Sequence, residues 1–327
     1  MAQLSTPWWL RNGHANTVYS FLRGRGIALP PAHEDWVEVE PKVELLIRSH
    51  WQRQAAPALL LVHGLEGSSE AGYMLTTATA ALGRGWHVAR MNVRGCGDSE
   101  PRCATLYNSG KSGDVARAVE WLASRPLVSA VAVGGFSMGG NLVLKYAGER
   151  AEDALPPLLA VAAVSPCLDL AASADALHRK VNYFYERRFL ENLKGRLRRH
   201  DAREPGRYPV GRLGTLRSVR AFDDVITAPF TGYRNADDYY FRASAARVLD
   251  RIRVPTLILH AEDDPFIVVT QESRNTMEGN PNIRFIATRH GGHCAFINTR
   301  RSAEGVYWAE TRVAEFCDEV WRRGRKS

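Results

Sequence analysis

Three polar side chains follow apolar runs at points where they could together activate a nucleophile. Ser137 lies in GGFSMGGN, Asp264 in HAEDDPF and His293 in TRHGGHCAF. A serine hydroxyl attacks a carbonyl carbon only when a base removes its proton, and an acid must hold that base in one tautomer. The glycines around Ser137 permit the tight strand-to-helix corner that exposes such a serine. We predict that Ser137, His293 and Asp264 are nucleophile, base and acid.

The acid has two alternatives directly before it in the chain. Asp263 and Glu262 also follow the apolar run TLILHA. We favour Asp264 because it immediately precedes Pro265, which stiffens the turn, and because it lies further beyond the end of the predicted strand.

The base has one alternative, His290. We favour His293 because Gly291 and Gly292 leave the backbone before it free to turn. His290 is then expected to pack or to orient the loop, and Cys294 is expected to be a small packing residue.

A tetrahedral oxyanion needs two backbone N–H donors near the nucleophile. One donor should be Met138, which follows Ser137, and the other Leu65 in VHGLEGSS. Gly64 and Gly67 would let that loop turn its N–H groups inward. We expect His63 to orient the loop rather than to transfer protons.

This set of residues predicts hydrolysis of acyl esters through an acyl-enzyme, without a metal or an organic cofactor. An acyltransferase or a C–C bond hydrolase would use the same three residues, so both stay open. A non-catalytic binding protein on the same scaffold is the alternative from another class. The expected partner is a small-molecule or lipid ester, and no feature beyond one basic segment suggests nucleic acid.

The elements that must position these residues alternate between strands and helices. Strands are predicted at 58–64, 86–93, 130–136, 158–164, 256–262 and 282–288, and helices at 70–83, 109–124, 138–150, 266–277 and 302–323. The strands are continuously apolar, as in a parallel sheet covered on both faces. WVEVE and VELLIRSHW, on either side of Pro41, predict an antiparallel hairpin at the sheet edge. The fold class is therefore α/β, with a doubly wound, mostly parallel sheet.

The alternation stops between residues 168 and 245, after the sixth strand when the two strands of the hairpin are counted. We predict that this segment is an inserted helical cap, and that residues 1–167 and 246–327 form the core. Residues 179–220 contain thirteen Lys or Arg and four acidic residues, which exceeds the net charge of +8 of the whole chain. FLENLKGRLRRH should form an amphipathic helix whose basic face is either solvated or attracts an anionic ester or lipid surface.

Composition is ordinary for a folded protein, with 45% hydrophobic and 24% charged residues. Five cysteines without close spacing predict neither a disulfide framework nor a zinc site. We see no secretory signal pattern and no apolar run long enough to span a membrane, so a cytoplasmic protein is expected. Trp8 and Trp9 are expected to be buried and to anchor the amino-terminal arm.

Several motifs in one order resemble the YheT-like family of serine esterases and the related α/β-hydrolase-domain lipases of animals. They are PWWLRNGHANTVY, HGLEG, NVRGCGDS, YNSGKSGDV, GFSMGGN, FDDVITAPFTGY, DDYYFRAS, AEDDPF and GGHCAF, and they cover nearly the whole chain. The resemblance implies an α/β-hydrolase fold with Ser137 as nucleophile, Asp264 as acid and His293 as base.

Overall fold

One eight-stranded sheet forms the centre of the computed structural model, which describes residues 3–150, 158–299 and 305–325. Its strands are β1 (His33–Glu40), β2 (Val43–His50), β3 (Ala56–Val62), β4 (His87–Met91), β5 (Val128–Phe136), β6 (Leu158–Val164), β7 (Thr256–Ala261) and β8 (Ile283–Thr288). Their order across the sheet is β1-β2-β4-β3-β5-β6-β7-β8. Each lies where the sequence predicted a strand, within a few residues.

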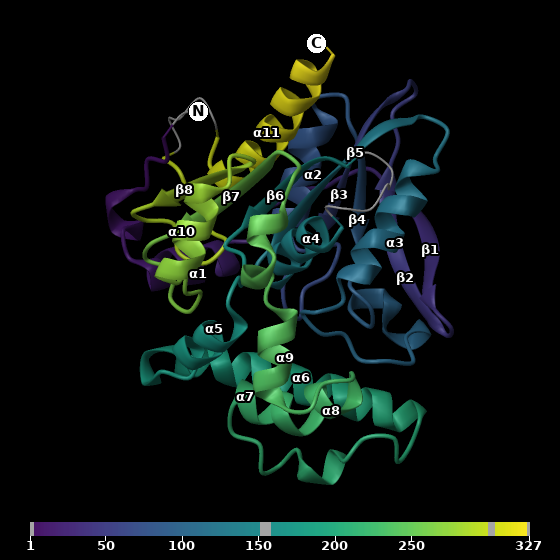
Figure 1. Ribbon diagram of the computed structural model, residues 1–327, viewed down its shortest axis with the longest axis vertical. Helices are drawn as coiled ribbons and strands as arrows, with labels where there is room; N and C mark the ends of the chain where they lie inside the picture. Colours follow the sequence, from purple (N-terminus) through teal and green to yellow (C-terminus); the bar gives the residue numbers. More distant parts are fainter. Residues whose placement is uncertain (1–2, 151–157, 300–304, 326–327) are drawn as a thin grey trace.

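The sheet is parallel from β4 to β8 and antiparallel only at one edge. The β1–β2 and β2–β4 pairs are antiparallel, and the five other neighbouring pairs are parallel. The predicted edge hairpin is therefore confirmed, with Lys42 in its turn at a φ of 64°. Figure 1 shows the twist of the sheet between its helical layers.

Helices cover both faces of the sheet, so the predicted doubly wound α/β class is confirmed. Alternate side chains of β3 enter separate cores: Leu59 and Leu61 pack with α2 and α11, whereas Leu60 and Val62 pack with α3, α4 and α10. The bounds are α2 (Gly72–Leu82), α3 (Ser112–Ala123), α4 (Met138–Glu149), α10 (Gln271–Gly279) and α11 (Trp308–Gly324). Continuous apolar runs are the consequence of burial on both faces.

Further helices lie between β6 and β7, as the sequence predicted, and gather beyond one end of the sheet (Figure 1). They are α5 (Leu170–Leu177), α6 (Tyr183–Arg203), α7 (Val219–Phe222), the π-helix η5 (Asp223–Thr227), α8 (Ala228–Phe230) and α9 (Ala236–Ala243). The amphipathic prediction for α6 is confirmed, because Leu190, Leu193 and Leu197 are buried. Short 3-10 turns are η1 (Trp8–Leu10), η2 (Gly97–Arg102), η3 (Lys180–Asn182), η4 (Val210–Arg212), η6 (Ala245–Arg247) and η7 (Leu249–Arg251).

The amino-terminal arm differs from the prediction. It forms the helix α1 (Gly13–Leu22), which has no predicted counterpart. The predicted burial of Trp8 and Trp9 is wrong, because they are 79% and 48% exposed, and Leu10 is the residue of η1 that enters the core. The inner side of the arm is occupied by Leu10 and by Gly13, which lies against the Asp263 carbonyl.

The helix predicted over 266–277 begins later, at Gln271. Residues 264–269 lie outside helix and strand, and two of their backbone groups bind polar side chains: Ile267 N–H donates to Asp264 and Val268 N–H to Ser173. Residues 302–304 of the predicted last helix lie outside the described residues. Within the described part of the chain, no helix combines the length and the apolarity that crossing a bilayer demands.

Candidate active site

Ser137 occupies the corner between β5 and α4 in a strained conformation, with φ 54° and ψ −118°. Its neighbours must be glycines for lack of space. A Cβ on Gly135 would lie 2.3 Å from the carbonyl oxygen of Gly139, and a Cβ on Gly139 would lie 2.3 Å from that of Val62. The local sequence therefore forces a bend that presents the Ser137 hydroxyl at the end of the strand.

The three residues predicted to act together are joined by two hydrogen bonds. The Ser137 hydroxyl lies 3.0 Å from Nε2 of His293, and Nδ1 of His293 lies 2.8 Å from Oδ2 of Asp264. The other oxygen of Asp264 accepts the N–H groups of Phe266 and Ile267 at 3.2 and 3.0 Å. With Nδ1 protonated, His293 donates to Asp264 and can accept the proton of Ser137.

Asp264 and His293 are buried together, and each favours the charged form of the other. Burial alone would raise the pKa of Asp264, but the His293 ring and the Ile267 N–H outweigh it and lower that pKa. Burial alone would lower the pKa of His293, but Cys294 and the Asp264 carboxylate raise it well above the ordinary histidine value. Asp264 is therefore anionic when His293 takes up a proton.

Two of the alternatives for acid and base, Asp263 and His290, contact each other and the loop that carries His293. Oδ1 of Asp263 accepts the N–H groups of Gly291 and Gly292 at 2.9 and 2.8 Å. Its other oxygen lies 3.3 Å from Nδ1 of His290. The adjacent carboxylates thus have separate tasks, one on the loop backbone and one on the His293 ring.

Helix α1 also holds this loop, through residues that the sequence analysis did not single out. The hydroxyl of Thr17 accepts the backbone N–H of His293 at 2.8 Å and donates to the carbonyl of Gly13 at 2.7 Å. A Cβ on Gly13 would overlap the carbonyl oxygen of Asp263. The motif RNGHANT carries a family resemblance but no local signal of this role, because nothing in its spacing indicates contact with residues 263–293.

The loop after β3 passes directly against the nucleophile. A Cβ on Gly64 would lie 3.1 Å from the Cβ of Ser137. His63 is fully buried, and its two ring nitrogens contact the Gly64 carbonyl and the Val93 N–H at 2.8 and 3.0 Å. Burial lowers the pKa of His63 to about 4, so the ring is neutral. These contacts give His63 the loop-orienting role that the sequence predicted.

Leu65 and Met138 line the same cavity as Ser137. The N–H of Met138 is the first of helix α4 and therefore has no acceptor inside the helix. Leu65 follows Gly64 in the loop that faces Ser137. The two residues predicted to donate to an oxyanion are thus brought to the nucleophile from separate elements.

Two hollows meet at Ser137. The inner cavity lies under helices α5 to α9 and is lined mostly by apolar side chains, among them Leu106, Leu170, Leu177, Leu193, Phe222 and Ile267. The outer cleft runs from Ser137 and His293 toward solvent between helices α1 and α6. An apolar hollow beside an activated hydroxyl can bind a hydrocarbon group.

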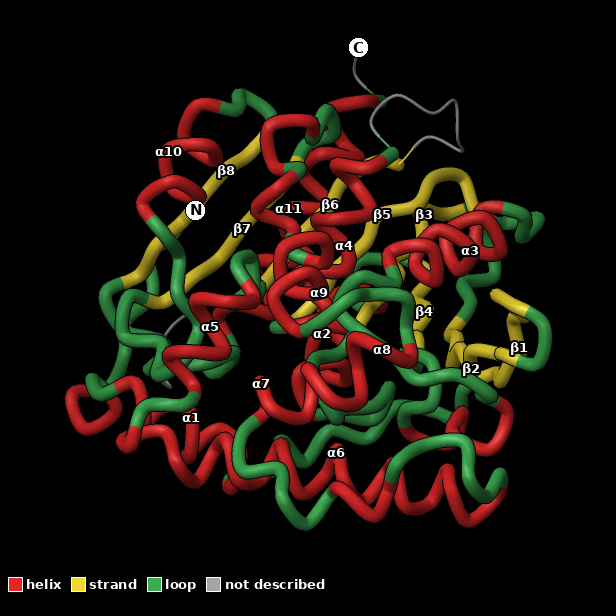
Figure 2. Tube along the Cα trace, turned by 60° about the horizontal axis from the view of Figure 1, so that its bottom comes forward, coloured by secondary structure: helices red, strands yellow, loops and turns green. Residues whose placement is uncertain are grey.

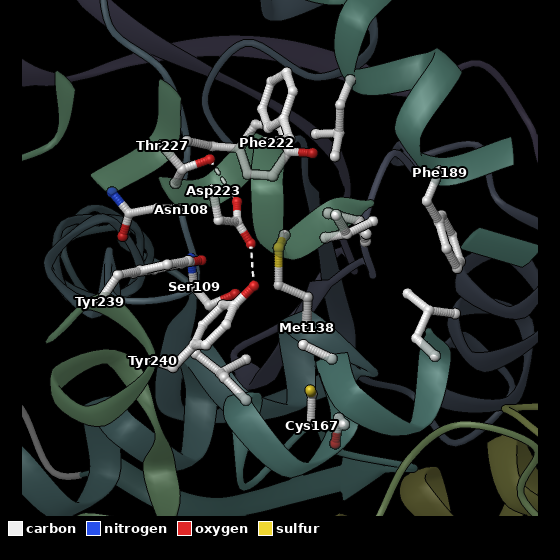
Figure 3. A pocket seen from close by; sticks show the side chains of 18 of the residues that line it. Asn108, Ser109, Met138, Cys167, Phe189, Phe222, Asp223, Thr227, Tyr239 and Tyr240 are labelled. Carbon is white, nitrogen blue, oxygen red and sulfur yellow. Dashed lines mark hydrogen bonds between the residues drawn. The ribbon is translucent and has the colours of Figure 1, made fainter. Parts of the chain in front are cut away.

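One carboxylate stands inside the inner cavity. Asp223, in the π-helix, accepts hydrogen bonds from the hydroxyls of Thr227 and Tyr240 at 2.6 and 2.7 Å, as Figure 3 shows. Burial raises its pKa to about 6 even though both hydroxyls favour the charged form. Asp223 could not be predicted as a site residue from the sequence, because its only signal is the motif FDDVITAPF, whose spacing does not indicate chemistry.

The basic face of α6 is engaged by acidic side chains. Arg196 is buried against Glu66 with an Nε–Oε1 distance of 3.0 Å. Arg199 and Arg203 both bind Glu100, at 2.9 and 3.0 Å. Glu66 and Glu100 thus offset part of the positive charge that the sequence suggested for attracting an anionic ester.

Comparisons with known proteins agree with this architecture. The sequence profile described as "alpha/beta hydrolase fold" matches residues 57–299. "Putative esterase YheT" of Escherichia coli (strain K12) is 34% identical over 93% of this chain and 90% of that protein. "Phospholipase ABHD3" of Mus musculus is 28% identical over 82% of this chain and 62% of that protein.

A solved structure agrees at the level of the fold. The Pyrococcus furiosus esterase Pf2001 shares a TM-score of 0.57 and 17% sequence identity over 88% of this chain and 91% of that chain. The chain therefore belongs to the α/β-hydrolase family, as a relative of YheT.

Proposed function

We propose that this protein is a serine carboxylic-ester hydrolase that acts on acyl esters, including lipid-derived ones. The observation that carries the proposal is the hydrogen-bonded series Ser137–His293–Asp264 beside an apolar cavity. Two relatives whose names state esterase and phospholipase activity support the reaction class.

In the first half of the proposed reaction, the Ser137 oxygen bonds to the acyl carbon while its proton passes to Nε2 of His293. The negative carbonyl oxygen is held by the N–H groups of Leu65 and Met138. The bond to the alcohol oxygen then breaks, and His293 gives its proton to the departing alcohol. Ser137 is left as an acyl ester.

In the second half, His293 takes a proton from water, and the resulting hydroxide attacks the same acyl carbon. The bond to Ser137 breaks, the carboxylic acid leaves, and His293 returns the proton to the serine oxygen. Throughout, Asp264 holds the ring so that Nε2 faces Ser137 and stabilises its charged form.

The two hollows suggest how a substrate lies. We place the acyl chain in the inner cavity, because its walls are apolar, and the alcohol in the outer cleft, which leads to solvent. Residues 168–245 then act as a cap that supplies most cavity walls, on a core of residues 1–167 and 246–327. The five cysteines are free thiols, which supports the proposed cytoplasmic location.

A fluorophosphonate probe together with acyl esters of graded chain length tests the proposal. The probe should label the wild type, and Ser137→Ala should abolish both labelling and ester hydrolysis while its circular dichroism spectrum stays unchanged. A labelled Ala variant would refute the assignment of the nucleophile. Addition of an alcohol acceptor distinguishes acyl transfer from hydrolysis by the ester that it forms.

A further inference from the structure

We propose that one surface, made by η1, helix α1, η3 and the start of α6, docks this protein on an anionic lipid bilayer with its outer cleft facing the membrane. The inference rests on the proposed function, since it states where that enzyme meets lipid esters. The docking surface is defined by six exposed apolar side chains: Trp8, Trp9, Phe21, Leu22, Val181 and Phe184.

Exposed apolar side chains are concentrated there. Eleven large apolar side chains of the described residues are strongly exposed, and eight of them lie within residues 8–22 and 181–184. Phe184 is 80% exposed, Trp8 79% and Leu22 73%. Contiguous exposed apolar groups of this size are unfavourable in water and are typical of interaction sites.

The two segments form one continuous surface. The Arg188 guanidinium of α6 lies 4.4 Å from the centre of the Phe21 ring of α1. The rings of His14 and Tyr185 stack 5.7 Å apart, again between α1 and α6. Trp9 packs on Tyr19 of the same helix α1. Figure 2 shows α1 close to the beginning of α6.

The surface borders the entrance to the candidate active site. Val18 and Phe21 of α1 line one side of the outer cleft, and Arg188 and Phe189 of α6 line the other. His293 lies in the same cleft. A bilayer that covers the docking surface would therefore stand at the opening through which a lipid ester enters.

The charge around the surface identifies the occupant. Residues 8–27 and 179–192 contain seven basic residues and two acidic ones. One acidic residue, Glu186, is buried and binds the N–H of Val219, and one basic residue, Arg25, pairs with Glu310. Six basic side chains and one carboxylate thus remain around the apolar groups, which matches an anionic lipid surface. A second copy would bring an equally basic surface against it, because a two-fold contact repeats one patch.

Vesicle flotation tests the proposal with the full chain. The wild type should float with vesicles of equimolar phosphatidylcholine and phosphatidylglycerol. The double variant Leu22→Ser, Phe184→Ser should bind these vesicles at least about tenfold more weakly, because insertion depends on buried apolar area. Phe241→Ser is the matched control: Phe241 is 57% exposed and carries the Arg247 guanidinium 4.0 Å from its ring centre, yet lies on α9.

Each outcome decides a separate point. Equal binding by the wild type and the double variant, or an equal loss in the Phe241→Ser control, would overturn the docking surface. A wild-type dimer in light scattering that the double variant converts to a monomer would assign the surface to a second copy instead. Hydrolysis of a short soluble ester should be unchanged in the double variant. If the wild type floats with the vesicles but hydrolyses no ester, the proposed function is refuted and the docking surface is not.

Discussion

The hydroxyl of Thr17 accepts the backbone N–H of His293 at 2.8 Å across 276 positions of the chain. The first helix therefore holds the loop that carries the proposed base. Removal of this hydroxyl leaves one N–H of the loop without its acceptor and allows His293 to shift relative to Ser137.

Thr17→Val should lower kcat by about 10- to 100-fold, the cost of a displacement of about 1 Å in a reacting group, with little change in KM. Thr17→Ser should restore most of the activity, because it restores the acceptor. Thr79→Val is the control, since Thr79 makes the same bond to the carbonyl four residues earlier in α2 without touching the loop. An unaltered kcat in Thr17→Val would show that the loop holds His293 without α1.

The adjacent carboxylates should respond very differently to the same substitution. Asp264→Asn should lower kcat by up to ~10⁴, because an amide favours the wrong tautomer of His293. Asp263→Asn should cost much less, because its amide oxygen can still accept the N–H groups of Gly291 and Gly292. Steady-state kinetics on one soluble ester compares them, and the reverse ranking would mean that Asp263 is the acid.

The pH dependence of kcat/KM should report the raised pKa of His293. The neutral ring is the base, so activity should be low below this pKa and should increase as pH rises through it. The acidic limb should therefore lie above pH 6.5, the ordinary histidine value. Asp264→Asn removes the carboxylate charge beside the His293 ring, which lowers the pKa of the ring, and should therefore move the limb to lower pH. A limb at or below pH 6.5 in the wild type would contradict the proposed pairing.

Asp223 should make the protein less stable as pH rises. Its pKa is raised from 3.8 to about 6, so the folded state binds the proton more tightly than the unfolded state. The stability that this proton supplies is fully present below about pH 4 and is lost as pH rises through about 6. As pH rises from about 4 to about 7, the wild type should therefore lose stability relative to Asp223→Asn. The loss in unfolding free energy should be up to about 3 kcal/mol, at about 1.4 kcal/mol per pKa unit.

Urea unfolding at several pH values between about 4 and 7 measures this shift. The neighbouring Asp224 is exposed, and Asp224→Asn is the matched control for the substitution itself. If the difference in unfolding free energy between Asp223→Asn and the wild type does not change with pH, water or a bound group solvates the Asp223 carboxylate.

The sequence carried enough information to predict the sheet and the three central site residues. Buried strands such as β3 are apolar on both faces, which distinguishes them from surface segments without any knowledge of their partners. The corner at Ser137 is local: the two glycines and the strained φ concern residues within the same few positions. Asp264 and His293 were predicted because each follows a strand, and parallel strands end at one edge of the sheet.

Only the tertiary structure shows the features of the site that depend on contacts between distant segments of the chain. Thr17, Gly13 and Asp263 hold the His293 loop through contacts whose partners stand far apart in the chain, so no local pattern reveals them. Burial of Asp223 and the pairing of Arg196 with Glu66 likewise follow from how the helices between β6 and β7 fold over the sheet. The predicted burial of Trp8 was wrong, because hydrophobicity alone does not tell whether an apolar side chain faces the core or the solvent. Backbone strain and hydrophobic periodicity are encoded locally, whereas the position of a loop or the environment of a charge is set by whichever segment packs against it.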